Sequence, residues 1–277
     1  MNIIDAHTHI GDIYTGTQIQ YPLDKIPFGL VSILELLKFN RPYPRSKKNS
    51  SRLLGDIAYM ESCKRVQLCK PETYIEIFKK NGVNKAILLP IEPNVKTEYV
   101  IELSKKYQEF IPFASVDFSQ TDYLARLKFN IENGCKGIKI HPVIQKIHPE
   151  DERIANILEE FSKYNLPVCF HTGPARAGFI KIDAEKFAYP ENFINLLKKF
   201  PKMKFIFVHM GLEYYNIVIE MALKFKNIYL DTSFQPPKTI LKALQNLGCE
   251  RLIFGSDFPL VKQETTLNIL KTSIKDN

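Results

Sequence analysis

The chain has 277 residues, of which 45% are hydrophobic and 25% charged, and its formal net charge is +8. This length is enough for one large domain with a substantial core, and both fractions are ordinary for a soluble globular protein. No stretch is long and apolar enough to span a bilayer, and none of the five cysteines forms a CxxC pair. These features argue against a membrane protein and a disulfide scaffold. A strand predicted from Asn2 onward leaves no room for a signal peptide, so we expect a cytoplasmic protein.

The first predicted strand, Ile3–His9, is separated from the next elements by a long insertion, residues 11–70. The insertion contains a short helical pattern at Leu30–Leu37 and a polar tract at residues 41–52. We interpret it as a lid or rim over a pocket, because long insertions after a barrel strand lie at the catalytic face. A disordered surface loop is the alternative for the polar tract. The insertion is also basic, but no nucleic-acid motif accompanies it, so we expect neither a nucleic-acid nor a membrane partner.

From residue 71 onward, amphipathic segments of helix length alternate with apolar runs of strand length. The predicted helices are Pro71–Lys80, Thr97–Tyr107, Asp122–Glu132, Pro149–Tyr164, Pro190–Phe200, Glu213–Lys224, Lys238–Leu247 and Glu264–Ser273. The predicted strands are Lys85–Ile91, Phe110–Val116, Gly137–His141, Leu166–His171, Met203–His209, Ile228–Thr232 and Arg251–Ser256. Such alternation indicates a parallel sheet, and eight strands in this length favour an α/β fold, the (β/α)8 TIM barrel, as one domain over residues 1–277. An open doubly wound sheet would need a glycine-rich phosphate loop after an early strand, and the sequence has none.

Metal-binding side chains stand at the polar ends of four predicted strands. His7 and His9 end the first strand, His171 and His209 end two later ones, and Asp257 follows the last. A single histidine in an apolar strand is usually a buried residue bonded to a carbonyl group, but here the pattern repeats at the same end of several strands. Residues two apart share a face, so His7 and His9 project together at the barrel mouth. Together with His171 and Asp257 they would bind a divalent metal, Zn²⁺ first, with Mn²⁺ or another transition metal as alternatives. His209 is expected to point inward on its strand, after Phe205 and Phe207.

Five motifs carry a family resemblance over the whole chain except the insertion. They are Asp5-Ala6-His7-Thr8-His9, Gly137-Ile138-Lys139-Ile140-His141-Pro142, His171-Thr172-Gly173, His209-Met210-Gly211 and Gly255-Ser256-Asp257-Phe258-Pro259. With them the chain resembles the amidohydrolase superfamily of metal-dependent barrel hydrolases. It is most similar to the branch that includes aminocarboxymuconate-semialdehyde decarboxylase, the hydroxybenzoate-type decarboxylases and the pyrone-dicarboxylate lactonase. Members of this branch are often dimers or larger, so the resemblance implies a homodimer.

The resemblance also implies roles for the residues at the mouth. His7, His9 and His171 would be metal ligands, and Asp257 a ligand or near-ligand that also takes the proton of metal-bound water. His209 would be the catalytic histidine that polarises substrate or assists deprotonation. Binuclear relatives carry a carbamylated lysine on strand four; we interpret Lys139 there as a charged anchor, with carbamylation as the alternative.

Three cationic or polar residues suggest a small anionic substrate. Arg176 lies in a glycine-containing loop after His171, and an arginine there can bind a carboxylate through two parallel hydrogen bonds. Lys139 and His141 share the inward face of their strand. A rim arginine paired with a surface acid is the alternative for Arg176.

The sequence therefore predicts an enzyme, a metal-dependent hydrolase acting on a small, carboxylated substrate. A nonoxidative decarboxylase would use the same ligands. A binuclear phosphoesterase or nuclease-like barrel is a second alternative, and an inactive metal-binding scaffold is the non-enzymatic one.

Overall fold

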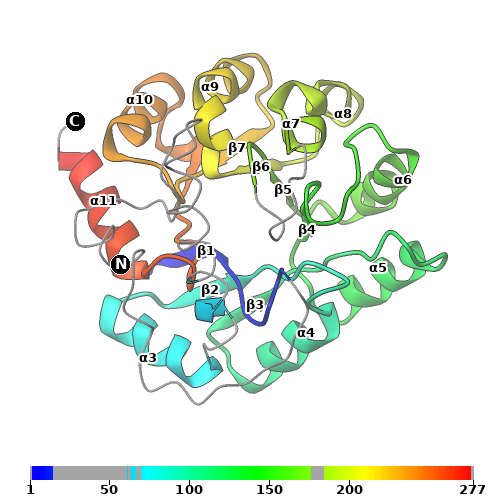
Figure 1. Ribbon diagram of the computed structural model, residues 1–277, viewed down its shortest axis with the longest axis horizontal. Helices are drawn as coiled ribbons and strands as arrows, with labels where there is room; N and C mark the ends of the chain where they lie inside the picture. The colour runs from blue at the N-terminus through cyan, green and yellow to red at the C-terminus, as the bar shows by residue number, and fades with distance from the viewer. Residues whose placement is uncertain (1, 15–60, 62–63, 67–69, 176–183, 276–277) are drawn as a thin grey trace.

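The computed structural model describes residues 2–14, 61, 64–66, 70–175 and 184–275 of the chain. Within these residues, eight parallel strands form an inner layer and the helices surround them (Figure 1). The strands are β1 (Ile4–Thr8), β2 (Lys85–Leu88), β3 (Phe110–Pro112), β4 (Ile138–Ile140), β5 (Val168–His171), β6 (Phe205–Val208), β7 (Ile228–Asp231) and β8 (Leu252–Ile253). The predicted α/β class and TIM-barrel architecture are confirmed. Most of the insertion, and with it the predicted lid and polar tract, lies outside the described residues.

The helices alternate with the strands along the chain. They are α3 (Pro71–Asn81), α4 (Thr97–Lys106), α5 (Tyr123–Glu132), α6 (Glu152–Phe161), α7 (Ala184–Ala188), α8 (Ile194–Lys199), α9 (Tyr215–Lys224), α10 (Pro237–Leu247) and α11 (Gln263–Lys275). Short 3-10 segments are η1 (Ser162–Tyr164), η2 (Pro190–Phe193), η3 (His209–Tyr214) and η4 (Cys249–Arg251). Among the helices of the described residues, none combines the length and apolar character needed to cross a membrane.

The strands pair in chain order within two sheets, β1-β2-β3 and β4-β5-β6-β7-β8. Backbone hydrogen bonds connect the sheets at two seams. At the β3–β4 seam, the Ala114 N–H donates to the Gly137 carbonyl at 2.8 Å, and the Lys139 N–H donates to the Ala114 carbonyl at 2.8 Å. Sequence neighbours thus stay neighbours in space around the barrel.

The β8–β1 seam joins the two ends of the chain. The Ala6 N–H donates to the Phe254 carbonyl at 2.9 Å, and the His9 N–H donates to the Phe258 carbonyl at 2.8 Å. The Asp257 N–H donates to the His7 carbonyl at 2.8 Å. This seam therefore brings Asp257 beside β1, although 250 positions separate Asp257 from His7.

Alternation along the strands separates an outer from an inner core. On β5 and β6, Phe170 and Phe207 pack outward in the large cluster that includes the helices. Their neighbours Cys169, Ile206 and Val208 belong to a cluster inside the barrel. The inner cluster also includes Leu89 and Phe113, and the barrel is therefore a packed core below the mouth.

Helix α6 illustrates why these sequences form the outer layer. The Asp151 carboxylate accepts a hydrogen bond from the Arg153 backbone N–H at 3.0 Å and so caps the first turn. The buried side chains recur at helical spacing: Ile154, Ile157, Leu158 and Phe161. Burying each such side chain contributes roughly 1.5–3 kcal/mol, so this stripe fixes the helix against the sheet.

Strand pairing ends earlier than the apolar runs predict. The predicted strands Lys85–Ile91 and Arg251–Ser256 pair only as β2 and β8. Near the mouth the backbone turns away from the extended conformation, and His209 and Asp257 both have a φ of 59°. The predicted helix Pro190–Phe200 is divided into η2 and α8, and α7 was not predicted. The last helix, α11, is longer than predicted and lies between α10 and α3 in the ring (Figure 1).

Candidate metal centre at the barrel mouth

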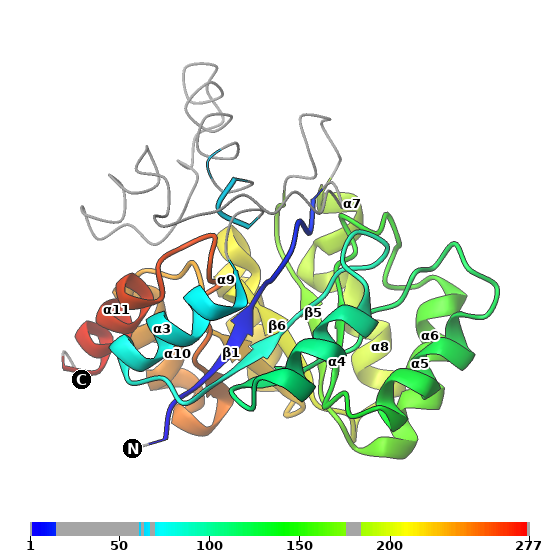
Figure 2. The same cartoon turned by 90° about the horizontal axis from the view of Figure 1, so that it is seen from below.

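Strand β1 supplies two buried histidines to one point. Its pairing with β2 is irregular between Asp5 and Thr8, and the chain then continues toward the face where the strands end (Figure 2). His7 Nδ1 lies 2.6 Å from Asp231 Oδ2, and His9 Nδ1 lies 2.7 Å from the Leu89 carbonyl oxygen. A carbonyl oxygen or an ionised carboxylate accepts but does not donate, so both rings carry their proton on Nδ1. The Nε2 atom of each ring therefore has no proton and carries a lone pair.

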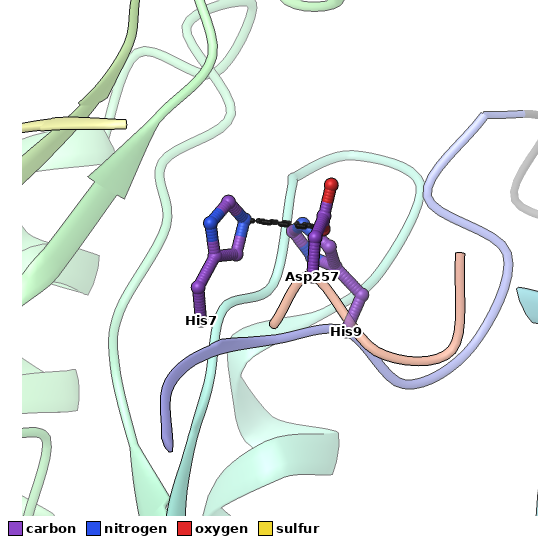
Figure 3. Close-up of side chains that lie close together, drawn as sticks. All are labelled: His7, His9 and Asp257. Atoms are coloured by element: carbon purple, nitrogen blue, oxygen red, sulfur yellow. Dashed lines mark hydrogen bonds and ion pairs between the residues drawn. The ribbon is translucent and has the colours of Figure 1, made fainter. Parts of the chain in front are cut away.

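These two lone pairs converge with a carboxylate oxygen. His7 Nε2 and His9 Nε2 are 3.1 Å apart, and each lies 3.2 Å from Asp257 Oδ1. Figure 3 shows the three side chains pointing toward one another. Asp257 Oδ1 is buried and has no hydrogen-bond donor among the described residues. Three acceptors facing one another without a proton repel, and each buried acceptor left unsatisfied costs about 1–3 kcal/mol.

A cation bound between the three acceptors would remove this repulsion. A tetrahedral metal with bonds of about 2.0–2.1 Å separates its ligand atoms by roughly 3.3 Å. The observed separations of 3.1–3.2 Å fit that value. His7 Nδ1 and His9 Nδ1 are also bonded in the way typical of metal-bound histidines, which donate their second N–H to a carboxylate or a carbonyl. His7, His9 and Asp257 could therefore hold a divalent ion.

His171, at the end of β5, presents a further ring nitrogen to the pocket. Its Nε2 is buried and has no hydrogen-bond partner in the described part of the chain. Its ring lies 5.1 Å from the His209 ring, centroid to centroid, and stacks on the His141 ring at 4.0 Å. His171 is not among the residues whose ligand atoms lie within 4.8 Å of one another, a condition that His7, His9 and Asp257 meet. It thus faces the same pocket from farther away, and it stays a predicted ligand.

His209 reaches the pocket by a different route from the one expected. Phe205 and Phe207 pack outward against the helices, so regular alternation would place His209 on the outer face as well. The strand ends at Val208, however, and His209 has a φ of 59°, which turns its side chain inward. Its ring centroid is 5.0 Å from that of His7, and its Nε2 lies 3.9 Å from Asp257 Oδ2. The expectation of an inward His209 is met, but the reason is a backbone turn.

Strand β4 contributes a buried cation and a further imidazole. Ile138 and Ile140 belong to the outer core cluster, so Lys139 faces inward, opposite Cys169 on β5. Lys139 is 1% exposed. His141 stacks on His171, and its Nδ1 accepts the Ile144 backbone N–H at 3.2 Å, which leaves the ring proton on Nε2. Arg176, the third predicted anion-binding residue, lies outside the described residues.

Burial controls the charge states in this pocket. It lowers the pKa values of four imidazoles well below the ordinary histidine value; these are His7, His141, His171 and His209. Burial also lowers the pKa of Lys139 and raises that of Asp231 to about 6. It opposes the ionisation of Asp257 too, but positive charge beside it, on His7, His9 or Lys139, outweighs burial and lowers the pKa of that carboxyl. Neutral imidazoles and an ionised Asp257 are the states in which these groups bind a metal.

Two residues that organise the pocket are not among the predicted metal ligands, catalytic residues or substrate-binding residues. Asp231 ends β7 and holds His7 Nδ1, and Ser233 follows it and contacts His209 Nδ1 at 2.7 Å. The signal for Asp231 was present, since it is an acidic residue at the polar end of a predicted strand. Asp5, in contrast, belongs to the β8–β1 seam, where it accepts hydrogen bonds from the Ser256 N–H at 2.9 Å and from Gln263 Nε2 at 2.7 Å.

Known structures of similar shape are TIM-barrel and amidohydrolase-type proteins. An uncharacterized TIM-barrel protein from Bordetella bronchiseptica is 17% identical with a TM-score of 0.68, covering 99% of this chain and 94% of that one. A probable 2-pyrone-4,6-dicarboxylic acid hydrolase from Acinetobacter baumannii, with citric acid bound, is 13% identical with a TM-score of 0.59, covering 99% and 92%. A 5-carboxyvanillate decarboxylase from Novosphingobium aromaticivorans, complexed with manganese and 4-hydroxy-3-methoxy-5-nitrobenzoic acid, is 16% identical with a TM-score of 0.59, covering 99% and 93%. At these identities the likeness establishes the fold.

The sequence itself identifies the family. No curated protein sequence gives a significant match to the chain. The family model described as Amidohydrolase, however, matches residues 4–273, from the first strand to the last helix. With the barrel and its polar mouth, this match shows that the chain belongs to the amidohydrolase family and is an enzyme of that superfamily.

Proposed function

We propose that the protein is a metal-dependent hydrolase that adds water to the acyl carbon of a small, carboxylated ester, lactone or amide. The observation that carries this proposal is the convergence of His7 Nε2, His9 Nε2 and Asp257 Oδ1, three buried acceptors, of which Asp257 Oδ1 has no donor among the described residues. In the proposal these residues and His171 hold one divalent cation, Zn²⁺ first and Mn²⁺ as the alternative. A cation held there would polarise the acyl oxygen and lower the pKa of water to roughly 7.

Two residues of the chain are proposed to move the proton. Asp257 Oδ2 faces His209 Nε2 at 3.9 Å, so both can contact a water that lies against the carboxylate. The water oxygen bonds to the acyl carbon, and its proton passes to Asp257 or His209. The bond from the acyl carbon to oxygen or nitrogen then breaks, and the leaving atom takes that proton. Such acid–base assistance contributes about 10²–10⁴-fold to a rate.

The charge of the pocket supports an anionic substrate. Asp231 and Asp257 against Lys139 leave one net negative charge among these buried groups, which a divalent cation would convert to one net positive charge. Lys139 and His141 are proposed to bind a substrate carboxylate, with Arg176 as a third donor. A carboxylate held by a charged donor gains about 1.5–3 kcal/mol.

Isotope incorporation tests the reaction class. Purified protein loaded with Zn²⁺ or Mn²⁺ would be incubated with carboxylated lactones, amides and hydroxybenzoates in ¹⁸O-labelled or deuterated water. Hydrolysis places one ¹⁸O in the product acid without release of CO2, and His209→Asn should lose about 10²–10⁴-fold in turnover while it keeps its metal. Release of CO2 with deuterium on the product carbon would replace the hydrolase proposal.

A nonoxidative decarboxylase is the second candidate. The same residues would serve it, with the carbon–carbon bond to the carboxylate broken and the carbon protonated in its place. The observation in its favour is the occurrence of decarboxylases among the structures of similar shape, including 2,6-dihydroxybenzoate decarboxylase from Rhizobium. The isotope experiment separates the two candidates in one assay.

A further inference from the structure

Ser233 links the two halves of the polar cluster at the mouth. Its Oγ donates a hydrogen bond to Asp231 Oδ1 and lies 2.7 Å from His209 Nδ1. Asp231 Oδ2, in turn, holds His7 Nδ1 at 2.6 Å. Ser233 is completely buried, and its backbone N–H also donates to Asp231 Oδ1 at 2.6 Å. A continuous chain of hydrogen bonds therefore runs from His209 through Ser233 and Asp231 to His7.

Counting the protons in this chain fixes its direction. A serine hydroxyl has one proton, and Ser233 gives it to the Asp231 carboxylate. Toward His209 the hydroxyl oxygen can then only accept, so His209 carries its ring proton on Nδ1. His209 Nε2 is left as a lone pair on the side of Asp257 Oδ2, 3.9 Å away. A histidine with the opposite tautomer would present an N–H to the site and could not accept a proton there.

We propose that Ser233 is a positioning residue that holds His209 in the Nδ1–H tautomer, so that Nε2 faces the metal pocket as a base. This inference rests on the proposed role of His209 as the group that takes the proton of water. In this proposal Ser233 and Asp231 do not contact the substrate; they act by orienting other side chains. Asp231 orients a proposed ligand, His7, and, through Ser233, it also orients the proposed base.

The backbone around His209 fixes the position of the imidazole but not its tautomer, so a hydrogen bond to the ring is needed to select the tautomer. Positive φ values at His209, Met210 and Leu212 form a tight turn, and Gln235 Nε2 donates to the His209 carbonyl. The turn brings the imidazole into the pocket but leaves the choice of tautomer open. Among the described residues, Ser233 Oγ is the hydrogen-bond partner recorded for His209 Nδ1.

Long-range ¹H–¹⁵N spectra of histidine rings measure the tautomer directly. The metal-free protein would be labelled with ¹⁵N-histidine and studied at about pH 8, where aspartate is ionised. His209→Asn identifies the His209 signals among the six histidines. We expect a protonated Nδ1 and an unprotonated Nε2 in the wild type and in Ser233→Thr, which keeps the hydroxyl. Ser233→Ala should move the proton wholly or partly to Nε2.

Two outcomes would overturn the proposal: a protonated Nε2 in the wild type, or an unchanged His209 tautomer in Ser233→Ala. The wild-type spectrum decides the first even if the alanine variant does not fold. Ser273→Ala is the matched control, because Ser273 is a buried serine of α11 whose hydroxyl donates to the Ile269 carbonyl at 2.8 Å. It should leave the His209 signals unchanged.

Kinetics provide a second readout on the metal-loaded protein. With a substrate found in the isotope experiment, Ser233→Ala should lower kcat by about 10–100-fold with little change in KM or metal content, and Ser233→Thr should restore most of the loss. An unchanged kcat would also overturn the proposal. The spectra need no substrate, so a protein without hydrolase activity would contradict the proposed function and still leave the tautomer measurable.

Discussion

The two seams of the barrel are both closed by backbone hydrogen bonds, but an apolar side chain packs at one seam and polar side chains pack at the other. At the β3–β4 seam, Gly137 lies under the Phe113 ring, and a Cβ at Gly137 would come within 2.2 Å of that ring. At the β8–β1 seam, a Cβ at Gly255 would come within 2.7 Å of His7 Cβ and 2.9 Å of the Asp231 carboxyl. Both seams therefore need a residue without a side chain. One is filled by an aromatic ring, and the other by polar groups that also form the site.

The difference shows where stability and function separate in this fold. The β3–β4 seam is held by apolar packing, which needs only a matching shape. The β8–β1 seam holds Asp5, which is fully buried, and burial raises its pKa to about 6. Polar groups buried in this way are stable only when fully hydrogen-bonded, so the seam beside the metal pocket depends on a few exact contacts. We expect substitutions at the β8–β1 seam to change metal binding and stability together, and those at Gly137 and Phe113 of the β3–β4 seam to change stability alone.

The largest effect is expected for Asp257→Asn. The amide keeps the shape but loses the charge that binds metal and accepts a proton, so turnover should fall by at least about 10²–10⁴-fold. Metal affinity should fall with it. Asp117→Asn, a buried aspartate after β3, is the control and should retain metal and turnover. Full metal content and activity in Asp257→Asn would remove Asp257 from the site.

The Asp5→Ala substitution should produce the largest loss of stability. It leaves the Ser256 N–H, the Ser256 hydroxyl and the Gln263 amide without their acceptor. At about 1–3 kcal/mol for each of these three buried groups, we expect a loss of at least about 3 kcal/mol in the unfolding free energy, measured with urea. Metal affinity should fall too, because Ser256 adjoins Asp257. A loss below about 1 kcal/mol would mean that this seam is not held by Asp5.

A matched pair of glycine substitutions tests the comparison itself. Gly137→Ala and Gly255→Ala each add one methyl group at a crowded seam, and overpacking typically costs about 1–3 kcal/mol. Gly255→Ala should also displace His7 and lower metal affinity, whereas Gly137→Ala should leave metal affinity unchanged. Phe113→Leu combined with Gly137→Ala should regain part of the lost stability, since a smaller side chain makes room. Equal effects of both alanines on metal binding would contradict the separation of the two seams.

The sequence predicts the barrel well because its signals are local. Apolar runs, helix stripes such as the one in α6, and paired histidines two residues apart in β1 all follow from neighbouring residues. The contacts from Asp231 to His7 and from Ser233 to His209 do not follow from neighbouring residues. They join different strands through single hydrogen bonds, and the direction of each bond depends on the histidine tautomer. The inward turn of His209 could not be predicted from strand alternation either, because it follows from a left-handed backbone conformation after β6.

The smallest effect is expected away from both seams, at the cap of α6. Asp151→Ala should cost about 1 kcal/mol, the usual value of an N-cap, without any change in metal content. Hydrogen bonds from Arg153 lower the pKa of Asp151 below its ordinary 3.8. The stabilisation that the Asp151 carboxylate provides is therefore complete above about pH 4. It is lost as the pH falls through the lower pKa that Asp151 has in the folded protein. The stability difference between wild type and variant, followed by urea unfolding from pH 7 to pH 3, should shrink only at the acidic end. A difference that grows toward low pH would contradict this sign.

The most direct test of the central claim is a metal analysis combined with an anomalous-scattering map of crystals of the protein. We predict one divalent ion per chain, bound by His7 Nε2, His9 Nε2 and Asp257 Oδ1 and approached by His171 Nε2. His7→Ala, His9→Ala and His171→Ala should each lose it, while His148→Ala, a control at a partly exposed loop residue, should keep it. A full metal equivalent in all three pocket variants, or an anomalous peak elsewhere in the barrel, would contradict the account.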